Sequence, residues 1–142
     1  MNEQQKAAKD KLLAELSNET YVMAQPSAIH GIGVFALRNI PKGTRNIFSS
    51  GIGEFIKVPA TDVDALPEHS RKLVETYCLY DEENYFIPDY GFKLMDLALY
   101  LNHSDEPNVA SINEGEFFEA LRDIQPGEEL LVDYGTLVDP EL

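Results

Sequence analysis

The sequence predicts a mainly β domain that begins with a helix and carries a short helical insert. Residues 4–16 have apolar side chains at the spacing of one helix face: Ala8, Leu12, Leu13 and Leu16. Short apolar segments interrupted by glycine and proline occupy residues 21–58 and return after Asp81. A chain of 142 residues is long enough for one domain with its own core.

The residues also predict a helix in the insert and a β-hairpin after it. The segment 70–79 is predicted to be helical, because four apolar residues share one side: Leu73, Val74, Tyr77 and Cys78. Segments 109–112 and 116–121 flank Asn113-Glu114-Gly115, which predicts a β-hairpin with glycine at the position that tolerates a positive φ. The order is therefore helix, short strands, helical insert and strands again.

The charge balance restricts the partners. The chain has 11 Lys and Arg against 25 Asp and Glu, a formal net charge of −14. Nucleic-acid phosphates are bound by clustered basic residues, so we expect no direct contact with nucleic acid. The charge suits a basic, lysine-bearing protein or peptide, whose approach it would accelerate. Solubility alone accounts for the charge equally well.

The cysteine and histidine content argues against a metal site. Cys78 is the only cysteine, which excludes an internal disulfide or a multi-cysteine cluster, and the three histidines do not form an HExxH pattern. No apolar run reaches the length of a membrane span, and the N-terminus lacks the apolar stretch of a secretory signal. We expect a cytoplasmic protein with no membrane partner. The oligomeric state stays open.

The first candidate cluster is HGIGVF at residues 30–35. Gly31 and Gly33 allow the backbone to approach a ligand closely, leaving N–H and C=O groups free to bind it. A lone GxG is more often a β-bulge or a tight turn. It is not a dinucleotide-binding fingerprint, because no third glycine and no helix follow.

Two more clusters lie toward the C-terminus. NHSDEPN at residues 102–108 begins with Asn102, which offers a donor and an acceptor to a zwitterionic amino-acid ligand. Such clusters are also common surface turns, and a lone histidine such as His103 is more often structural than catalytic. GEELLVDYG at residues 127–135 contains Tyr134, whose hydroxyl either enters a cleft or lies at the rim of the core.

In this order and spacing the clusters resemble the SET domain, a family of protein-lysine methyltransferases. The resemblance runs through HGIGVFALRNIPKG, LNHSDEPN and EALRDIQPGEELLVDYG, with a poorly matched stretch at 44–96. It implies a β-clip fold of several short sheets, in which the C-terminal segment threads under a preceding loop as a pseudoknot. We expect an N-terminal helical extension at 1–20 and the SET domain at 21–142, with its variable insert at about 60–95.

The resemblance also implies S-adenosylmethionine as cofactor and a lysine of another protein as methyl acceptor. The Asn102 side chain would engage the methionine portion, and the His103 backbone the adenine. The residues implied for the cofactor are Gly31, Ile32, Gly33, Asn102, His103 and Tyr134. The lysine channel would enter from the opposite face and contain Tyr134, the catalytic residue, with Val132 and Tyr100 beside it.

Methyl transfer to lysine needs a neutral amine. Free lysine has a pKa near 10.4, and an apolar channel beside a cationic cofactor disfavours the ammonium form. Alignment of the two reactants supplies much of the remaining acceleration. Because the pKa of free tyrosine lies near 10, we interpret Tyr134 as an orienting and electrostatic group and not as a general base.

Three positions depart from the family pattern. No cysteine-rich tail follows Gly135, so we expect residues 136–142 or the substrate to cover the lysine channel. Asp105 stands where cysteine is usual. Val132 stands where tyrosine or phenylalanine is common, and its apolar side chain predicts di- or trimethylation instead of monomethylation alone.

Two alternatives to the enzyme stay open. A catalytically silent SET-like module would bind a peptide or cofactor without transfer, although the presence of Asn102, His103 and Tyr134 argues against it. A β-clip domain that binds a sugar or an acid would not need the NHSDEPN and VDYG pair and would have no affinity for S-adenosylmethionine. The substrate protein cannot be read from the sequence.

Overall fold

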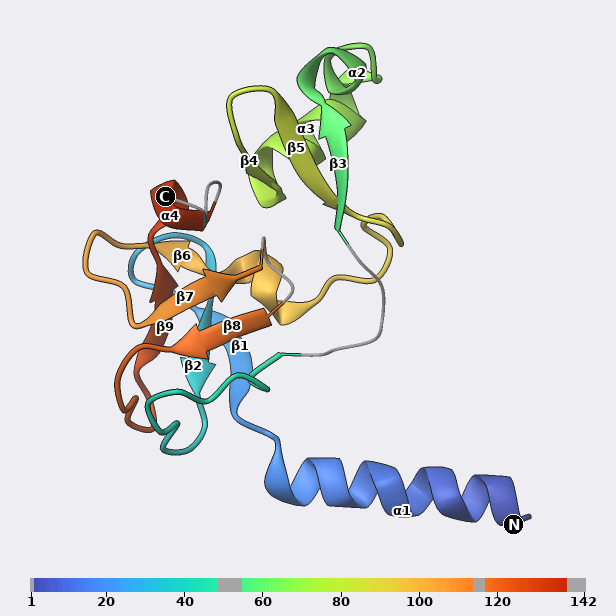
Figure 1. Cartoon of the computed structure of the whole chain (residues 1–142), viewed down its shortest axis with the longest axis vertical. Coiled ribbons are helices and arrows are strands. Elements are labelled where there is room, and N and C mark those ends of the chain that lie inside the picture. Colours follow the sequence, from blue (N-terminus) through green and yellow to red (C-terminus); the bar gives the residue numbers. More distant parts are fainter. Residues whose placement is uncertain (1, 49–54, 114–116, 138–142) are drawn as a thin grey trace.

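A helix, a body of small sheets and an insert make up the described part of the chain. The computed structural model describes residues 2–48, 55–113 and 117–137. Helix α1 (Glu3–Asn18) starts with a capping box, in which Asn2 and Gln5 exchange side chain–backbone hydrogen bonds. Figure 1 shows that α1 leads into β1 and projects away from the body, while the insert lies at the opposite end.

The largest sheet joins segments from both ends of the domain, in the order β1-β2-β9-β6. Its strands are β1 (Val22–Pro26), β2 (Ile32–Ala36), β6 (Asn102–His103) and β9 (Glu129–Val132). Strands β6 and β9 pair in parallel, whereas β1, β2 and β9 pair antiparallel. Strand β9 therefore lies between the glycine-containing strand β2 and the strand that carries Asn102.

Two smaller sheets complete the described β structure. The insert has the strand order β3-β5-β4, and β7 pairs with β8 as a hairpin. The strands are β3 (Phe55–Pro59), β4 (Leu79–Tyr80), β5 (Asn84–Pro88), β7 (Val109–Ile112) and β8 (Phe117–Ala120). The short helices are α2 (Ala60–Asp64), α3 (Glu68–Tyr77), the 3-10 helix η1 (Leu97–Tyr100) and α4 (Tyr134–Leu137).

The body and the insert have separate apolar cores. In the body, Val34 of β2 faces Leu130 of β9 across the sheet, and both side chains are fully buried. In the insert, Val63 and Val74 pack with Cys78. Burial raises the pKa of the Cys78 thiol to about 12, so this thiol stays protonated at neutral pH.

A buried asparagine fixes β9 against the NHSDEPN loop. Asn108 Nδ2 donates to the Glu129 carbonyl at 2.9 Å, and Asn108 Oδ1 accepts from the Leu131 N–H at 2.7 Å. The loop backbone adds hydrogen bonds from Ser104 N–H to the Val132 carbonyl and from Asn108 N–H to the Leu131 carbonyl. The C-terminal segment therefore lies against this loop, as the sequence predicts.

The predicted N-terminal helix, helical insert and β7–β8 hairpin are all present. The insert helix begins earlier than predicted, at Glu68. In the hairpin turn Asn113 has a positive φ of 53°, while Glu114 and Gly115 lie outside the described residues. Residues 49–54 of the extended stretch predicted at 46–58 also lie outside them.

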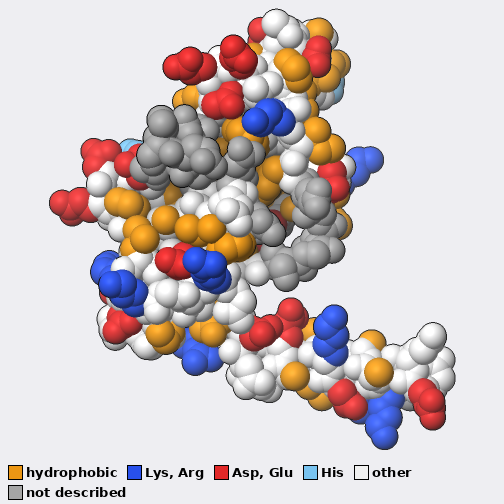
Figure 2. All heavy atoms as spheres, viewed as in Figure 1, with side chains coloured by type: hydrophobic (Ala, Val, Ile, Leu, Met, Phe, Trp, Pro, Cys, Tyr) orange, Lys and Arg blue, Asp and Glu red, His pale blue; other side chains and the backbone are white. Residues whose placement is uncertain are grey.

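The apolar face predicted for α1 has no cover among the described residues. Leu12, Leu13 and Leu16 are 51%, 52% and 55% exposed, and no residue of α1 is buried. Figure 2 shows the sides of this helix standing clear of the body. No helix in the described residues is both long and apolar enough to cross a membrane.

Candidate functional site

The loop between β1 and β2 presents the first glycine cluster at the surface. The Ser27 N–H donates to the Gly31 carbonyl at 2.8 Å, which closes the loop. Gly31 has a φ of +46°, a conformation that glycine adopts without the strain of a side chain. Gly31 and Ile32 are exposed, Ile32 by 48%, so a ligand can reach the loop at these two residues, whereas Gly33 is buried.

Gly33 is required for a different reason, because other side chains lie very close to its backbone. A Cβ added at Gly33 would overlap the carboxylate of Glu129 and lie 3.1 Å from the Cβ of Ser27. The Glu129 carboxylate ends a flexible side chain, but hydrogen bonds from Ser27 and Asn102 oppose its movement. This glycine therefore makes room for a carboxylate.

The Glu129 carboxylate is held by two donors. The Ser27 hydroxyl donates to its two oxygens at 2.8 and 3.0 Å, and Asn102 Nδ2 donates to Oε2 at 2.8 Å. Sequence reasoning missed Glu129 and Ser27 as site residues. A signal for Glu129 was its charge beside the buried Leu130 in GEEL, but Ser27 lies 102 residues away and had none.

Asn102 joins the loop to β9. It is 6% exposed, and its Nδ2 also lies 3.1 Å from the His30 carbonyl and 3.4 Å from the Ile32 carbonyl. Because all three partners of this atom are acceptors, it must be the amide nitrogen, which fixes the orientation of the side chain. Within the described residues, Oδ1 of Asn102 accepts no hydrogen bond. An oriented acceptor is thus available to a ligand.

Tyr134 is fixed at two points. Its N–H donates to His103 Nδ1 at 3.0 Å, and its hydroxyl donates to the Leu101 carbonyl at 2.7 Å. Burial raises the pKa of the Tyr134 hydroxyl above its ordinary value, so the group remains a donor at physiological pH. The Tyr134 hydroxyl is therefore held at Leu101, the residue that directly precedes Asn102.

His103 orients this tyrosine as an acceptor. Since Nδ1 accepts the Tyr134 N–H, the ring proton lies on Nε2, which is 3.1 Å from Oδ1 of Asp105. The His103 and Tyr134 rings are 5.1 Å apart. Asp105, for which the sequence indicated no role, is thus the partner that favours this tautomer. No group of three or more His, Cys, Asp or Glu in the described ranges is placed to hold a metal ion.

Comparison with known families identifies this arrangement. The profile of the SET domain matches residues 31–135, which is most of the chain and includes every residue implied for the cofactor. The chain belongs to the SET domain family. The family and the β fold predicted from the sequence are therefore confirmed.

Two relatives illustrate the membership. The SET domain of this chain is similar to part of a Schizosaccharomyces pombe protein, the H3 lysine-4 specific histone-lysine N-methyltransferase, at 33% identity over 115 residues. That match covers 77% of this chain and 12% of the relative. The crystal structure of a candidate histone methyltransferase from Plasmodium falciparum has the same fold, with a TM-score of 0.53 and 21% identity over 82% of this chain and 95% of that one.

Val132 and Tyr100, the two residues predicted beside the lysine channel, differ from each other in their surroundings. Val132 is 1% exposed and belongs to the core of the body. The Tyr100 hydroxyl points to Met95 Sδ at 3.7 Å, and its ring packs edge-on against Tyr77. The structure thus brings together the residues at 31–33, 102–103 and 134. The channel role of Val132 and Tyr100 stays a prediction.

Proposed function

We propose that this SET domain transfers methyl groups from S-adenosylmethionine to lysine side chains of another protein. The observation that carries the proposal is the joint anchoring of Tyr134 and Asn102. The Tyr134 hydroxyl is held by Leu101, while the next residue, Asn102, is held by the glycine loop. A ligand that contacts both Asn102 and the loop would lie beside the tyrosine.

The groups around Asn102 fit the cofactor. S-adenosylmethionine carries an amino-acid group and supplies a methyl group from a positively charged sulfonium. The Asn102 Oδ1 acceptor suits the ammonium of that amino acid, and the accessible backbone at Gly31 and Ile32 offers further polar groups. Gly33 and His103 complete the set that would hold the cofactor. The nearby Glu129 carboxylate adds negative charge.

Tyr134 acts by position and not as a base. Its raised pKa keeps the hydroxyl protonated, and its bond to the Leu101 carbonyl fixes the ring. The lysine amine must therefore lose its proton by other means, through an apolar surrounding and the positive charge of the cofactor. The role of the tyrosine is to align the amine with the methyl group.

The substrate class follows from charge and from the relative. The chain carries a net charge of −14, which favours the approach of basic segments. The S. pombe relative is named for a histone lysine. We infer a lysine in a basic protein segment as the acceptor, in a compartment without membrane contact such as the cytoplasm.

The number of methyl groups is a finer proposal. Val132 has no polar atom that could hold a water beside the amine, which favours di- or trimethylation. The product distribution after long incubation of the natural protein tests this. An enzyme that stops at one methyl group would contradict it.

The function itself is tested with a host lysate. The protein is incubated with the lysate and isotope-labelled S-adenosylmethionine, and tryptic peptides are analysed by mass spectrometry. Labelled methyl-lysine that depends on the added protein is the expected result. A protein that binds the demethylated cofactor in calorimetry but labels nothing, itself included, would be a silent module instead.

A further inference from the structure

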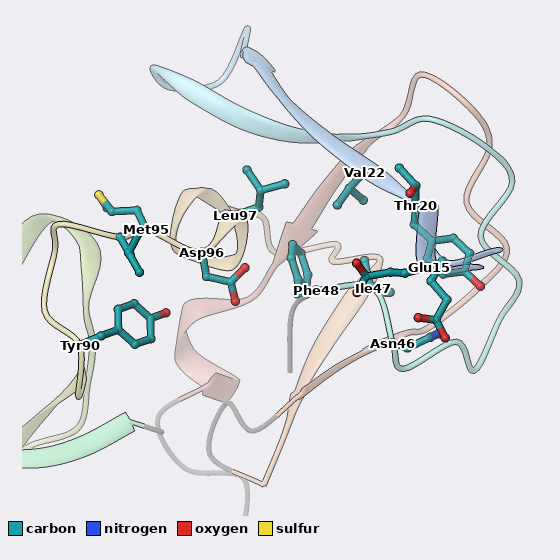
Figure 3. A pocket seen from close by; sticks show the side chains of 13 residues that line it. Glu15, Thr20, Val22, Asn46, Ile47, Phe48, Tyr90, Met95, Asp96 and Leu97 are labelled. Atoms are coloured by element: carbon teal, nitrogen blue, oxygen red, sulfur yellow. The ribbon is translucent and has the colours of Figure 1, made fainter. Parts of the chain in front are cut away.

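A hollow lies away from the glycine loop, at the other end of β1. It has a volume of about 390 Å³ and is bordered by the end of α1, the start of β1 and two loops. Figure 3 shows Tyr90 and Met95 at one end, Glu15 and Asn46 at the other, and Phe48 between them. We call this hollow the acidic pocket.

Its charged groups all have one sign. Glu15, Glu19 and Asp96 line the pocket, and no Lys, Arg or His is among its described lining residues. Within the described chain, the carboxylates of Glu15 and Glu19 form no hydrogen bond or ion pair. Negative charge on Asp96 and Asp89, added to the larger effect of burial, raises the pKa of Tyr90 at the far end. A cation entering the pocket would be attracted from several sides.

The position of these carboxylates is unfavourable for the helix itself. Glu15 lies in the last turn of α1 and Glu19 at its C-cap, four residues apart, and that turn contains no basic residue. Like charges at this spacing repel, and negative charge at a helix C-terminus opposes the helix dipole. Arg38 donates to the Asn18 carbonyl but does not line the pocket. A bound cation would relieve both effects.

The floor of the pocket is apolar. Val22, Phe48 and Leu97 line it between the acidic groups. Lysine and arginine side chains combine a hydrocarbon stem with a charged head, so they match an apolar floor with an acidic rim. The described lining offers no basic side chain that would pair with a small anion or an acidic peptide.

We propose that the acidic pocket docks a lysine or arginine side chain of the protein substrate, apart from the lysine that is methylated. The identity of this partner as the substrate rests on the proposed function. The pocket takes in Val22 at the start of β1, and the cofactor loop follows Pro26 at its end. The ends of a five-residue strand are about 13 Å apart, so the pocket and the cofactor loop are separated by the length of a few extended residues.

Binding of a lysine-free peptide tests the docking apart from methyl transfer. The probe is a fluorescein-labelled peptide of alternating arginine and glycine, titrated with the full chain at low salt and followed by anisotropy. The variant is the double substitution Glu15→Gln and Glu19→Gln. We expect at least fivefold weaker binding for this variant than for the natural chain.

The matched control removes the same charge from the same helix. Glu3→Gln with Asp10→Asn also removes two negative charges, but neither residue lines the pocket. We expect the control to bind within twofold of the natural chain. If the pocket variant and the control weaken binding equally, the peptide is attracted by the overall charge and not by the pocket, which would overturn the docking. Unchanged binding by the pocket variant would overturn it as well.

Turnover separates this inference from the proposed function. With a basic protein as methyl acceptor, the pocket variant should raise KM at least threefold and leave kcat within twofold. A chain with no transferase activity that still shows the pocket-dependent peptide binding would overturn the proposed function alone. An active chain with equal KM for both double variants would overturn the docking alone.

Discussion

The proposed cofactor site and the acidic pocket lie at opposite ends of β1, and their carboxylates differ in the partners that they have. Glu129 is held by the Ser27 hydroxyl and the Asn102 amide, in a space that Gly33 keeps open. Glu15 and Glu19 have no such partners and sit at the end of a helix that has no buried residue. The first arrangement is specified by contacts of the fold, and the second by charge alone.

The difference has consequences for substitution. A buried polar group that loses its partner destabilises the protein by the full desolvation of the group left behind. An exposed carboxylate can be neutralised with little effect on folding, because water already solvates it. Loss of the Asn102 amide should therefore reduce stability and binding together, whereas changes to Glu15 and Glu19 should reduce binding without destabilising the protein.

The largest effect is expected for Asn102→Ala. It removes the oriented acceptor and leaves the Glu129 carboxylate without one of its two donors, so cofactor binding should weaken by roughly 1.5–3 kcal/mol, about ten- to hundredfold. Calorimetry with the demethylated cofactor measures this. Asn39→Ala, at an exposed asparagine, serves as control. Unaltered affinity in a folded variant would mean that the cofactor lies elsewhere.

A smaller effect is expected for Gly33→Ala. The new methyl group meets the Glu129 carboxylate and the Ser27 side chain, and overpacking of this kind costs about 1–3 kcal/mol. Gly31→Asn should cost less, because nothing lies near that position and asparagine tolerates a positive φ. Urea unfolding compares the two variants. Equal losses of stability would show that the space beside Glu129 is not restrictive.

The smallest effect is expected at the pocket and has the opposite sign. Glu15→Gln with Glu19→Gln removes a like-charge pair from the negative end of α1, which should stabilise the last turn by about 0.3–1 kcal/mol. Slower amide hydrogen exchange in this turn is the measurement. Faster exchange would show that the carboxylates support the helix through contacts.

Short-range chemistry explains what the sequence predicted well. The glycine loop and the NHSDEPN and VDYG segments each depend on turn residues close in the chain. The spacing of apolar residues likewise predicted α1 and the insert. The positive φ at Asn113 shows the limit even here, because the hairpin prediction named glycine as the residue that tolerates one and said nothing of Asn113.

The features that the sequence could not predict depend on contacts between residues far apart in the chain. Ser27 and Glu129 meet across 102 residues, and neither belongs to a pattern that indicates the other. The hydrogen bond between His103 and Asp105 depends on which nitrogen of the His103 ring accepts the Tyr134 N–H. The burial of Val132 follows from the pairing of β9 with β2 and β6, which no local pattern specifies.

The most direct test of the account is the split between turnover and cofactor affinity in Tyr134→Phe. The substitution removes only the hydroxyl that donates to the Leu101 carbonyl, so the alignment at the methyl group is lost while the contacts at Asn102 remain. Turnover with labelled S-adenosylmethionine should fall at least tenfold, and calorimetric affinity for the demethylated cofactor should stay within about twofold. Unchanged turnover would remove Tyr134 from the reaction and contradict the account.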